Sequence, residues 1–354
     1  MQAMLKAERA QYLEDRRDRH KFQEYWRHTQ EGEWQPTTTG TAHEPDINSM
    51  EQPINPKFIR LISWNIDFMA GYAEERMSAA LQYLDKLVTS TPPEIPVVLF
   101  LQEMISSDLE QIRESEWVKK RFQVTDFDNQ NWTGFMYGTT TLVDRRLTIK
   151  SVFRVPWFSG MERDGLFVDL VLSSTCDDTA SILRLCNTHL ESLPADPPVR
   201  PTQLADAARY LKDGDVACAL LAGDLNAIQP FDRTLHTDNH LKDTYLELGG
   251  QEDTEDGYTW GPQAKKWSRE RFGSCRMDKI LFTGDLQPKS FGRIGMGVTV
   301  ADDVLKEVQQ ENEVGYVTDH YGVMGDFELL GGWKLADGNG VGNEEMGSGS
   351  AKEA

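Results

Sequence analysis

The sequence lacks several features that mark whole classes of protein. Its 354 residues contain only four cysteines, with no CxxC spacing and no histidines at zinc-ligand spacing. A disulfide-stapled fold and a structural zinc site are therefore not expected, and the thiols are expected to be reduced, as in intracellular proteins. No apolar run reaches 18 residues, so no membrane-spanning helix is expected. Charged residues begin at Lys6 and recur, so the N-terminus shows no signal-peptide core.

Positive charge is also scarce in this chain. Lysine and arginine number 37 against 57 aspartate and glutamate residues, which gives a formal net charge of −20. Proteins that bind long stretches of duplex usually carry a basic face, because contacts to phosphate dominate their affinity. The acidic balance therefore argues against extended, non-specific duplex binding. It leaves room for a small pocket, locally basic or filled by a metal ion, that holds one end of a strand.

The two ends of the chain differ in composition from its middle. Residues 1–31 are densely charged and are interpreted as a solvated arm, with a polar helix that docks a few aromatic side chains as the alternative. Residues 32–56 are rich in Thr, Pro, Gly and Glu and are interpreted as a linker. We therefore expect an arm and linker at 1–56, one folded domain at 57–332 and a disordered tail at 333–354.

Apolar periodicity in the middle segment predicts many strands and a few helices. Alternating or continuous apolar runs predict strands at 58–64, 97–101, 138–143, 147–155, 166–172, 182–186, 217–221, 275–281 and 323–330. Helical spacing predicts helices at 74–87, 108–122 and 200–212. Strands with interposed helices and no internal repeat predict a layered α/β protein with two sheets face to face.

Short polar islands lie at the ends of these predicted strands. Five islands share this design: Ser63–Asp67, Leu101–Glu103, Asn187–Ser192, Gly223–Asn226 and Val317–Val323. They repeatedly combine carboxylate, amide and imidazole groups. A hard metal ion prefers oxygen ligands, and a phosphate ester needs hydrogen-bond donors, so this combination suits both.

Two of the islands carry candidate metal ligands, each with an ordinary structural alternative. Glu103 follows a buried strand, where a carboxylate is costly unless it is compensated. It is either a Mg²⁺ ligand or a carboxylate stabilised by the dipole of the following helix. Asn65 and Asp67 lie two apart, so on a strand they would face the same side. Asp67 can add charge to the ion, with Asn65 orienting a ligand, or the two residues form a turn.

The Gly223–Asn226 island has the same spacing of polar residues. Gly223 allows the backbone to approach another strand closely. Asp224 is placed to activate or orient a water molecule, and Asn226 to position it. The alternative is an ordinary Asp-Leu-Asn turn.

Two histidines complete the set of candidate groups. His189 and His320 can donate hydrogen bonds to the non-bridging oxygens of a phosphate. His320 would do so best if a carboxylate kept it cationic, and Asp278 is the candidate. The alternative is that both histidines are satisfied residues of the core.

Taken in order, the islands resemble the signature blocks of the endonuclease/exonuclease/phosphatase superfamily. These blocks run W-N, Q-E, H-L, G-D-x-N and S/T-D-H, and the resemblance covers nearly all of residues 57–330. Within that superfamily the details are most similar to the tyrosyl-DNA phosphodiesterase 2 group. The stretches that carry this similarity are Leu61–Asp67, Leu101–Glu103, Thr188–Ser192, Ala222–Asn226, Tyr258–Trp260 and Thr318–Gly322.

The resemblance implies a fold and a set of roles. The fold is a four-layer α/β/β/α sandwich of two packed mixed sheets flanked by helices. The implied cofactor is Mg²⁺ at Glu103, with Asp67 adding charge and with Mn²⁺ able to substitute. The implied catalytic residues are Asp224, Asn226, Asn65, His189, His320, Asp278 and Asp319. The implied substrate-binding residues are Trp260 beside the 5′-terminal nucleotide, Arg163 near the phosphotyrosyl end, Tyr137 and Ser192.

The implied reaction is hydrolysis of a 5′-phosphotyrosyl bond on DNA, which leaves a 5′-phosphate, as in clearing trapped topoisomerase 2. The implied partners are 5′ ends of DNA carrying tyrosyl or peptide adducts, preferably single-stranded, and topoisomerase 2 remnants. A monomer without membrane contact, nuclear with a cytoplasmic pool, is expected. The sequence leaves open an abasic endonuclease, a deadenylase, a phosphoinositide phosphatase or a binding protein with an inactive site. It also does not separate DNA from RNA as the substrate.

The chain departs from the family pattern in two places. After the Asn of G-D-x-N the family often has Leu-Arg-Asp, whereas this chain has Ala227-Ile228-Gln229. A basic contact to DNA is therefore missing or supplied elsewhere. Animal members also carry an N-terminal ubiquitin-associated domain, which residues 1–31 are too short to match, so no ubiquitin partner is expected.

Overall fold

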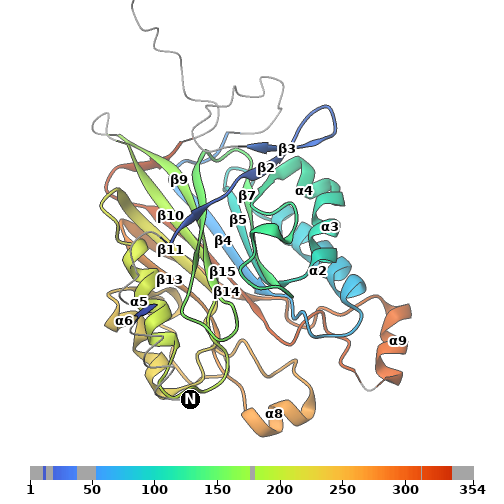
Figure 1. The fold of residues 1–354 in the computed structure, drawn as a ribbon. Helices are drawn as coiled ribbons and strands as arrows, with labels where there is room; N and C mark the ends of the chain where they lie inside the picture. Colours follow the sequence, from blue (N-terminus) through green and yellow to red (C-terminus); the bar gives the residue numbers. More distant parts are fainter. Residues whose placement is uncertain (1–10, 13–18, 38–52, 176–179, 312, 337–354) are drawn as a thin grey trace, which may run out of the picture.

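The computed structural model describes residues 11–12, 19–37, 53–175, 180–311 and 313–336. Two β-sheets of eight strands each lie face to face, and helices cover both outer faces (Figure 1). The predicted four-layer α/β/β/α sandwich is therefore confirmed. Among the helices of the described residues, none has the length and apolar character needed to cross a membrane.

The first sheet is mostly antiparallel, with one parallel pair, β10 and β11. Its strands are, in spatial order, β1 (Lys21–Phe22), β8 (Ile149–Pro156), β9 (Asp164–Ser174), β10 (Ala180–His189), β11 (Val216–Asp224), β13 (Asp278–Gly284) and β12 (Lys242–Asp243), and β16 (Trp333–Leu335) also pairs with β9. Its outer face carries α5 (Arg200–Tyr210) and α6 (Leu235–Asp238). The short α7 (Thr244–Glu247) lies next to β12.

The second sheet has the matching arrangement, with the parallel pair β4 and β5. Its strands are, in spatial order, β14 (Leu286–Ile294), β15 (Gly322–Leu329), β4 (Phe58–Asn65), β5 (Val97–Met104), β7 (Gly138–Asp144), β6 (Phe122–Val124), β2 (Tyr25–His28) and β3 (Trp34–Thr37). Its outer face carries α2 (Ala73–Thr89), α3 (Ser106–Glu114) and α4 (Glu116–Arg121). Two further helices, α8 (Lys266–Phe272) and α9 (Asp302–Gln310), project from the lower end in Figure 1.

Three apolar layers hold the four layers of backbone together. One lies between the sheets and includes Leu61, Phe100 and Leu220, each fully buried. The second lies between the second sheet and α2–α4, and the third between the first sheet and α5. The continuous apolar runs of β5 and β11 face two of these layers at once, which is why they show no alternation in sequence.

Some elements differ from the sequence prediction. The predicted helix at 108–122 is two helices, α3 and α4, because Ser115 between them has extended backbone torsions. The strand β14 was not predicted, since it is a polar edge strand that contains Pro288. The predicted strand at 275–281 begins only at Asp278.

The N-terminal segment is part of both sheets, which differs from the predicted arm and linker at 1–56. Strand β1 extends the first sheet beside β8, while β2 and β3 extend the second sheet beyond β6. Between them, the Gln23 side chain donates to Thr125 O (2.6 Å) and accepts from Arg154 Nε (3.0 Å). Charged edge strands hide the alternation that predicts a strand, and residues 1–10, 13–18 and 38–52 lie outside the described residues.

The C-terminal boundary of the folded domain also differs from the predicted one. Residues 333–335 form β16 on the edge of β9, although the sequence placed them in a disordered tail. The remainder of that predicted tail, 337–354, lies outside the described residues.

Replacing Arg154 by alanine is expected to destabilise the fold by about 3–5 kcal/mol. Arg154 is buried and contacts Asp126 Oδ1 at 2.8 Å and Asp164 Oδ2 at 3.1 Å, so its loss leaves two buried carboxylates without a cation. Lys150→Ala on the same strand is the matched control, because its pair with Asp215 is half exposed and contributes about 1 kcal/mol or less. Urea unfolding of both variants measures the difference, and equal midpoints would contradict this assignment.

Candidate active site

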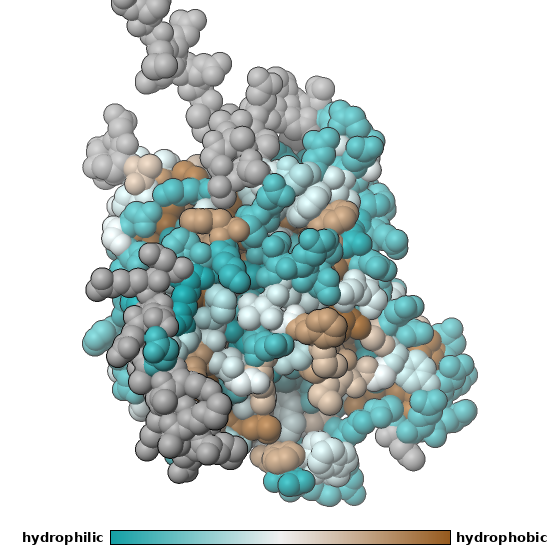
Figure 2. Space-filling model, in the orientation of Figure 1, coloured by the Kyte–Doolittle hydropathy of each residue, from teal (hydrophilic) through white to brown (hydrophobic). Residues whose placement is uncertain are grey.

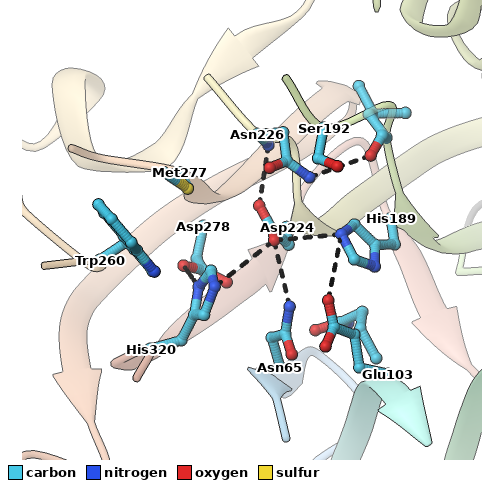
Figure 3. A network of polar contacts seen from close by, with 12 residues as sticks. Asn65, Glu103, His189, Ser192, Asp224, Asn226, Trp260, Met277, Asp278 and His320 are labelled. Carbon is cyan, nitrogen blue, oxygen red and sulfur yellow. Dashed lines mark hydrogen bonds and ion pairs between the residues drawn. The ribbon is translucent and has the colours of Figure 1, made fainter. Parts of the chain in front are cut away.

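The polar islands meet at one edge of the sandwich. The parallel strands β4 and β5 run toward this edge from one sheet, and the parallel strands β10 and β11 run toward it from the other. Strand β13 starts there, with its first residue paired to the last residue of β11. Figure 3 shows the side chains that point toward one another in this space: Asn65, Glu103, His189, Asp224, Asn226, Asp278 and His320.

Asp224 lies at the centre of this group. Its Oδ2 accepts from Asn65 Nδ2 (3.1 Å), lies 3.2 Å from His189 Nε2 and lies 3.7 Å from His320 Nε2. Its Oδ1 accepts from the backbone N–H of Asn226 (2.8 Å). Burial alone would raise the pKa of Asp224, but the charge of His320 and the donors around the carboxylate lower it below its ordinary value. Asp224 is therefore an ionised acceptor.

Two turns of the same kind follow β4 and β11. Asn65 Oδ1 accepts from the N–H of Asp67 (2.9 Å), and Asp224 Oδ1 accepts from the N–H two residues on. Asp67 and Asn226 both have left-handed backbone, with φ of 60° and 47°. The strand thus ends before Asp67, which corrects the expectation that Asn65 and Asp67 share one strand face. Asn65 and Asp224 therefore form turns, which was the structural alternative, and their side chains also lie in the site.

Gly223 is required by the close approach of β10 and β11. Its φ is 147°, and a Cβ there would lie 1.7 Å from the carbonyl oxygen of Thr188. The absence of a side chain lets these two strands place His189 directly opposite Asp224 in register.

The position of the proton on His189 follows from its neighbours. Arg163 Nη1 lies 2.5 Å from His189 Nδ1, and a guanidinium can only donate, so Nδ1 accepts. The ring proton is then on Nε2, which faces Asp224. Burial, followed by the positive charge of Arg163, lowers the pKa of His189 to about 4. His189 is therefore a neutral donor at neutral pH.

His320 carries the opposite charge state. Its Nδ1 donates to Asp278 Oδ2 (2.8 Å), and its Nε2 lies 3.8 Å from Asp319 Oδ1. Burial opposes a charge here, but the carboxylates of Asp278, Asp224 and Asp319 raise the pKa of His320 well above its ordinary value. His320 is therefore an imidazolium, as expected if Asp278 supports it.

Glu103 and Asp67 are neighbouring carboxylates that suit a hard cation. A bulge in the β5–β7 pairing and a φ of 57° turn Glu103 out of the strand, and its Oε2 accepts from the N–H of Phe68 (3.1 Å). Burial, and then the charge of Asp67, raise the pKa of Glu103 to about 7. Burial and the charge of Asp319 raise the pKa of Asp67 to about 6. Two partly desolvated carboxyl groups of this kind are stabilised by Mg²⁺ or Mn²⁺, so the residues fit the predicted ion.

A second set of possible metal ligands overlaps this site. Within the described residues, Asp224, Asp278 and His320 each offer a ligand atom within 4.8 Å of the other two. His320 Nδ1 donates to Asp278 Oδ2 (2.8 Å), so these three residues also form a charge-paired histidine. Glu103 and Asp67 remain the predicted ligands of an ion.

Trp260 lies at the side of the site next to His320. It makes isolated β-bridges with His320 and Cys275, and its Nε1 donates to Asp319 Oδ2 (2.7 Å). Asp319 is thereby held between the indole and His320. The predicted nucleotide-side aromatic is thus part of the site.

Tyr137 and Arg163 lie on the His189 side of the site. The Tyr137 ring stacks on Phe68 with centroids 4.1 Å apart, and the Arg163 guanidinium lies 4.9 Å from the Tyr137 ring centroid. The Tyr137 and His189 ring centroids are 6.5 Å apart. Ser192 lies beside Asn226 in Figure 3 and donates to Met161 Sδ (2.9 Å). Every residue predicted for the site therefore lies around the same centre.

Sequence reasoning missed some supporting residues. Thr259 Oγ1 accepts from the backbone N–H groups of Met277 (3.0 Å) and Asp278 (2.9 Å), which fixes the partner of His320. Gln102 Nε2 donates to Ser63 Oγ and to Asn187 Oδ1 (2.8 Å), and so links the two sheets beneath the site. Both lie in the quoted motifs, but their contacts depend on the pairing of the sheets.

Comparison with known proteins supports this description. A family model described as "Endonuclease/Exonuclease/phosphatase family" matches residues 62–320. No curated protein sequence matches the chain.

Solved structures with the same fold include several TDP2 proteins. D. rerio TDP2 complexed with single strand DNA product is 20% identical with a TM-score of 0.57, covering 77% of this chain and 99% of that chain. Truncated Caenorhabditis elegans TDP2 is 22% identical with a TM-score of 0.56, covering 77% and 98%. An endonuclease/exonuclease/phosphatase from Bacteroides vulgatus is 14% identical with a TM-score of 0.52, covering 77% and 99%.

Proposed function

Because the chain belongs to the endonuclease/exonuclease/phosphatase family, we propose that it is a Mg²⁺-dependent phosphodiesterase that hydrolyses 5′-phosphotyrosyl bonds on DNA. The observation that carries this proposal is the arrangement around Asp224. A neutral His189 and a cationic His320 flank this ionised carboxylate, and the Glu103 carboxylate lies 3.8 Å from His189. Such a site can surround a phosphate with donors while it keeps one acceptor for a water molecule.

Each residue of the site has a separate role in the proposed reaction. Asp224 accepts a hydrogen bond from the attacking water and orients it. The Nε2–H groups of His189 and His320 donate to the non-bridging oxygens, where charge develops in the transition state. Glu103, with Asp67 nearby, would hold a Mg²⁺ ion, which would supply Lewis-acid stabilisation of that charge.

The residues on the two sides of the site suit the two parts of the proposed substrate, the tyrosyl group and the nucleotide. Tyr137 and Arg163 lie next to His189, where a tyrosyl group can pack and its developing phenolate meets a cation. Trp260 lies next to His320, where a sugar or base can stack. Phenolate is a good leaving group, so a site with few proton donors is sufficient. The products would be tyrosine or a peptide, and a 5′-phosphate.

The proposed partners follow from this substrate. They are 5′ ends of DNA, preferably single-stranded, that carry a tyrosine or the peptide remnant of topoisomerase 2. The zebrafish TDP2 structure with a single-strand DNA product supports a strand end as the ligand. A monomer with a nuclear location completes the proposal.

A panel of substrates tests the proposal against other members of the family. Oligonucleotides with a 5′-tyrosine, an internal abasic site or a poly(A) tail, a soluble phosphoinositide, and the 5′-tyrosyl RNA equivalent are assayed side by side. The expected result is the highest kcat/KM on the 5′-tyrosyl oligonucleotide. Faster turnover of any of the abasic, poly(A) or phosphoinositide substrates would reassign the chain within its family.

Magnesium binding is expected to weaken as the pH falls. Mg²⁺ needs ionised carboxylates, and the raised pKa values of Glu103 (about 7) and Asp67 (about 6) mean that protons compete for them near neutral pH. The apparent Mg²⁺ affinity is expected to fall about tenfold per pH unit below pH 7 and more steeply below pH 6. Calorimetric titration of Mg²⁺ at pH 8, 7 and 6 measures this, and equal affinity at pH 8 and pH 6 would contradict the assigned ligands.

A further inference from the structure

Four exposed apolar side chains lie in loops on the His189 side of the site. Their exposed fractions are 80% for Met69, 89% for Phe135, 67% for Met136 and 60% for Leu193, although large apolar side chains are usually buried. In Figure 2 brown apolar side chains lie in the lower half of the molecule, where Figure 1 shows the loops at the lower ends of the sheets. Exposed apolar side chains that lie close together mark an interaction surface.

The loops that carry Met69, Phe135 and Met136 meet at Tyr137. Phe135 and Met136 directly precede Tyr137 in the sequence. Met69 follows Phe68, whose ring stacks on that of Tyr137 with centroids 4.1 Å apart. Each of the three exposed side chains is therefore within two residues of the ring pair beside the proposed tyrosyl position.

The loop that carries Leu193 is linked to the same group by two neighbouring residues. Ser192 donates to Met161 Sδ (2.9 Å), and the backbone N–H of Phe135 donates to Glu162 Oε2 (3.2 Å). Met161 and Glu162 thus contact the Leu193 loop and the Phe135 loop respectively. All four exposed side chains therefore border the same side of the site.

Leu193 is held in solvent by a backbone conformation that leucine rarely adopts. Its φ is 65°, in the left-handed region. Its carbonyl oxygen and that of Glu191 both accept from Nη1 of the buried Arg200, at 3.1 Å and 3.0 Å. A turn alone would be formed more easily by glycine or asparagine. A strained backbone that keeps an apolar side chain exposed points to a functional contact.

Covalent geometry identifies the ligand that these side chains would meet. In a peptide adduct the residues next to the linked tyrosine have Cα atoms about 3.8 Å from its Cα, so they lie near Tyr137 when the tyrosyl group packs there. Because they are tethered to the bound strand end, even weak apolar contacts would add to affinity. The exposed carboxylate of Glu162 lies between the loops and disfavours a polyanion, so a DNA strand is the less suitable occupant.

We propose that Met69, Phe135, Met136 and Leu193 form a surface that binds apolar side chains next to the linked tyrosine of a peptide adduct. The proposal rests on the proposed function, since it specifies the peptide part of the same substrate. The surface selects adducts whose tyrosine has apolar neighbours over adducts whose tyrosine has polar ones.

Three 5′ adducts of one oligonucleotide test the surface. They carry tyrosine alone, a pentapeptide with two leucines on each side of the tyrosine, and the same pentapeptide with serines. The wild-type kcat/KM is expected to be about 10-fold higher on the leucine than on the serine pentapeptide, as for burial of one apolar side chain. Phe135→Ser/Met136→Ser and Met69→Ser/Leu193→Asn are expected to lower that ratio to about one and to leave cleavage of the tyrosine adduct unchanged. Asparagine tolerates the left-handed backbone at 193.

The matched control is Phe22→Ser/Leu330→Ser, which is expected to keep the wild-type ratio. Phe22 is 62% exposed on the edge strand β1, and Leu330 is 40% exposed just after the end of β15 that is far from His320. Calorimetric titration with the two phosphotyrosyl pentapeptides, without DNA, measures the surface even if no tyrosyl bond is cleaved. Tighter binding of the leucine peptide, lost in Phe135→Ser/Met136→Ser, supports the surface whatever the reaction.

Three results would overturn the surface. The first is equal kcat/KM and equal Kd for the two pentapeptides in the wild type. The second is an equal loss of cleavage on the adduct of tyrosine alone in the loop variants, which would make these loops supports of the active site. The third is a wild-type dimer in light scattering that Phe135→Ser/Met136→Ser converts to a monomer, which would make the surface an interface between two copies of the chain.

Discussion

Replacing Glu103 by glutamine is expected to lower kcat/KM on a 5′-tyrosyl oligonucleotide by about 10³-fold, or roughly 4 kcal/mol of transition-state stabilisation. The amide keeps the size of the side chain and can still accept from the Phe68 N–H, so the fold has no reason to change. What it removes is the negative charge that holds the ion. The Mg²⁺ concentration for half-maximal activity is therefore expected to rise as well.

The same substitution is expected to stabilise the protein in EDTA. A carboxylate whose pKa is raised to about 7 by burial and by Asp67 is unfavourable when ionised without a cation. At pH 8 the neutral amide removes this cost, so the free energy of unfolding should increase by on the order of 2 kcal/mol. Glu110→Gln, an exposed carboxylate on α3, is the control and should alter neither quantity. Full turnover by Glu103→Gln on every phosphodiester tested would show that Glu103 does not hold a catalytic ion.

The second large effect is expected for Asp224→Asn. Asp224 accepts from Asn65, from the Nε2–H of His189 and from the N–H of Asn226. An amide has one acceptor oxygen, and its NH₂ group would face at least one of these donors. The variant also loses the charge that can orient and partly deprotonate the attacking water.

We expect kcat to fall about 10²- to 10⁴-fold in Asp224→Asn, the range for loss of a general base, with a smaller change in KM. Single-turnover cleavage of the 5′-tyrosyl oligonucleotide measures it. Asp215→Asn is the control, because the Asp215 side chain is 57% exposed and pairs with the half-exposed Lys150. A kcat within a few-fold of the wild type would show that another group acts on the water.

The architecture of the site was accessible from the sequence because it depends on strand ends. Each polar island follows or precedes a run of apolar residues, and parallel strands bring such positions to one edge of a sheet. Glu103 and Asp224 could be placed in this way. The charge of His320 was predicted from its candidate partner Asp278, which the structure places on the imidazole. The neutral state of His189 was not predicted, since it depends on Arg163, whose side chain meets the imidazole only in the folded sheets.

The peripheral elements were harder to predict for a different reason. Strands β1, β2 and β14 lie at or near sheet edges, where polar residues face water and weaken the alternation that predicts a strand. Helix α8 is short, with none of its residues buried, so its sequence shows no apolar face.

Release of tyrosine from a synthetic 5′-tyrosyl oligonucleotide, followed with Mg²⁺, with EDTA and after Mg²⁺ is restored, tests the account most directly. The site around Glu103, Asp224 and His320 predicts free tyrosine and a 5′-phosphorylated oligonucleotide with Mg²⁺, none with EDTA, and recovery on restoring the ion. An intact oligonucleotide in the presence of Mg²⁺, or equal cleavage in EDTA, would contradict it.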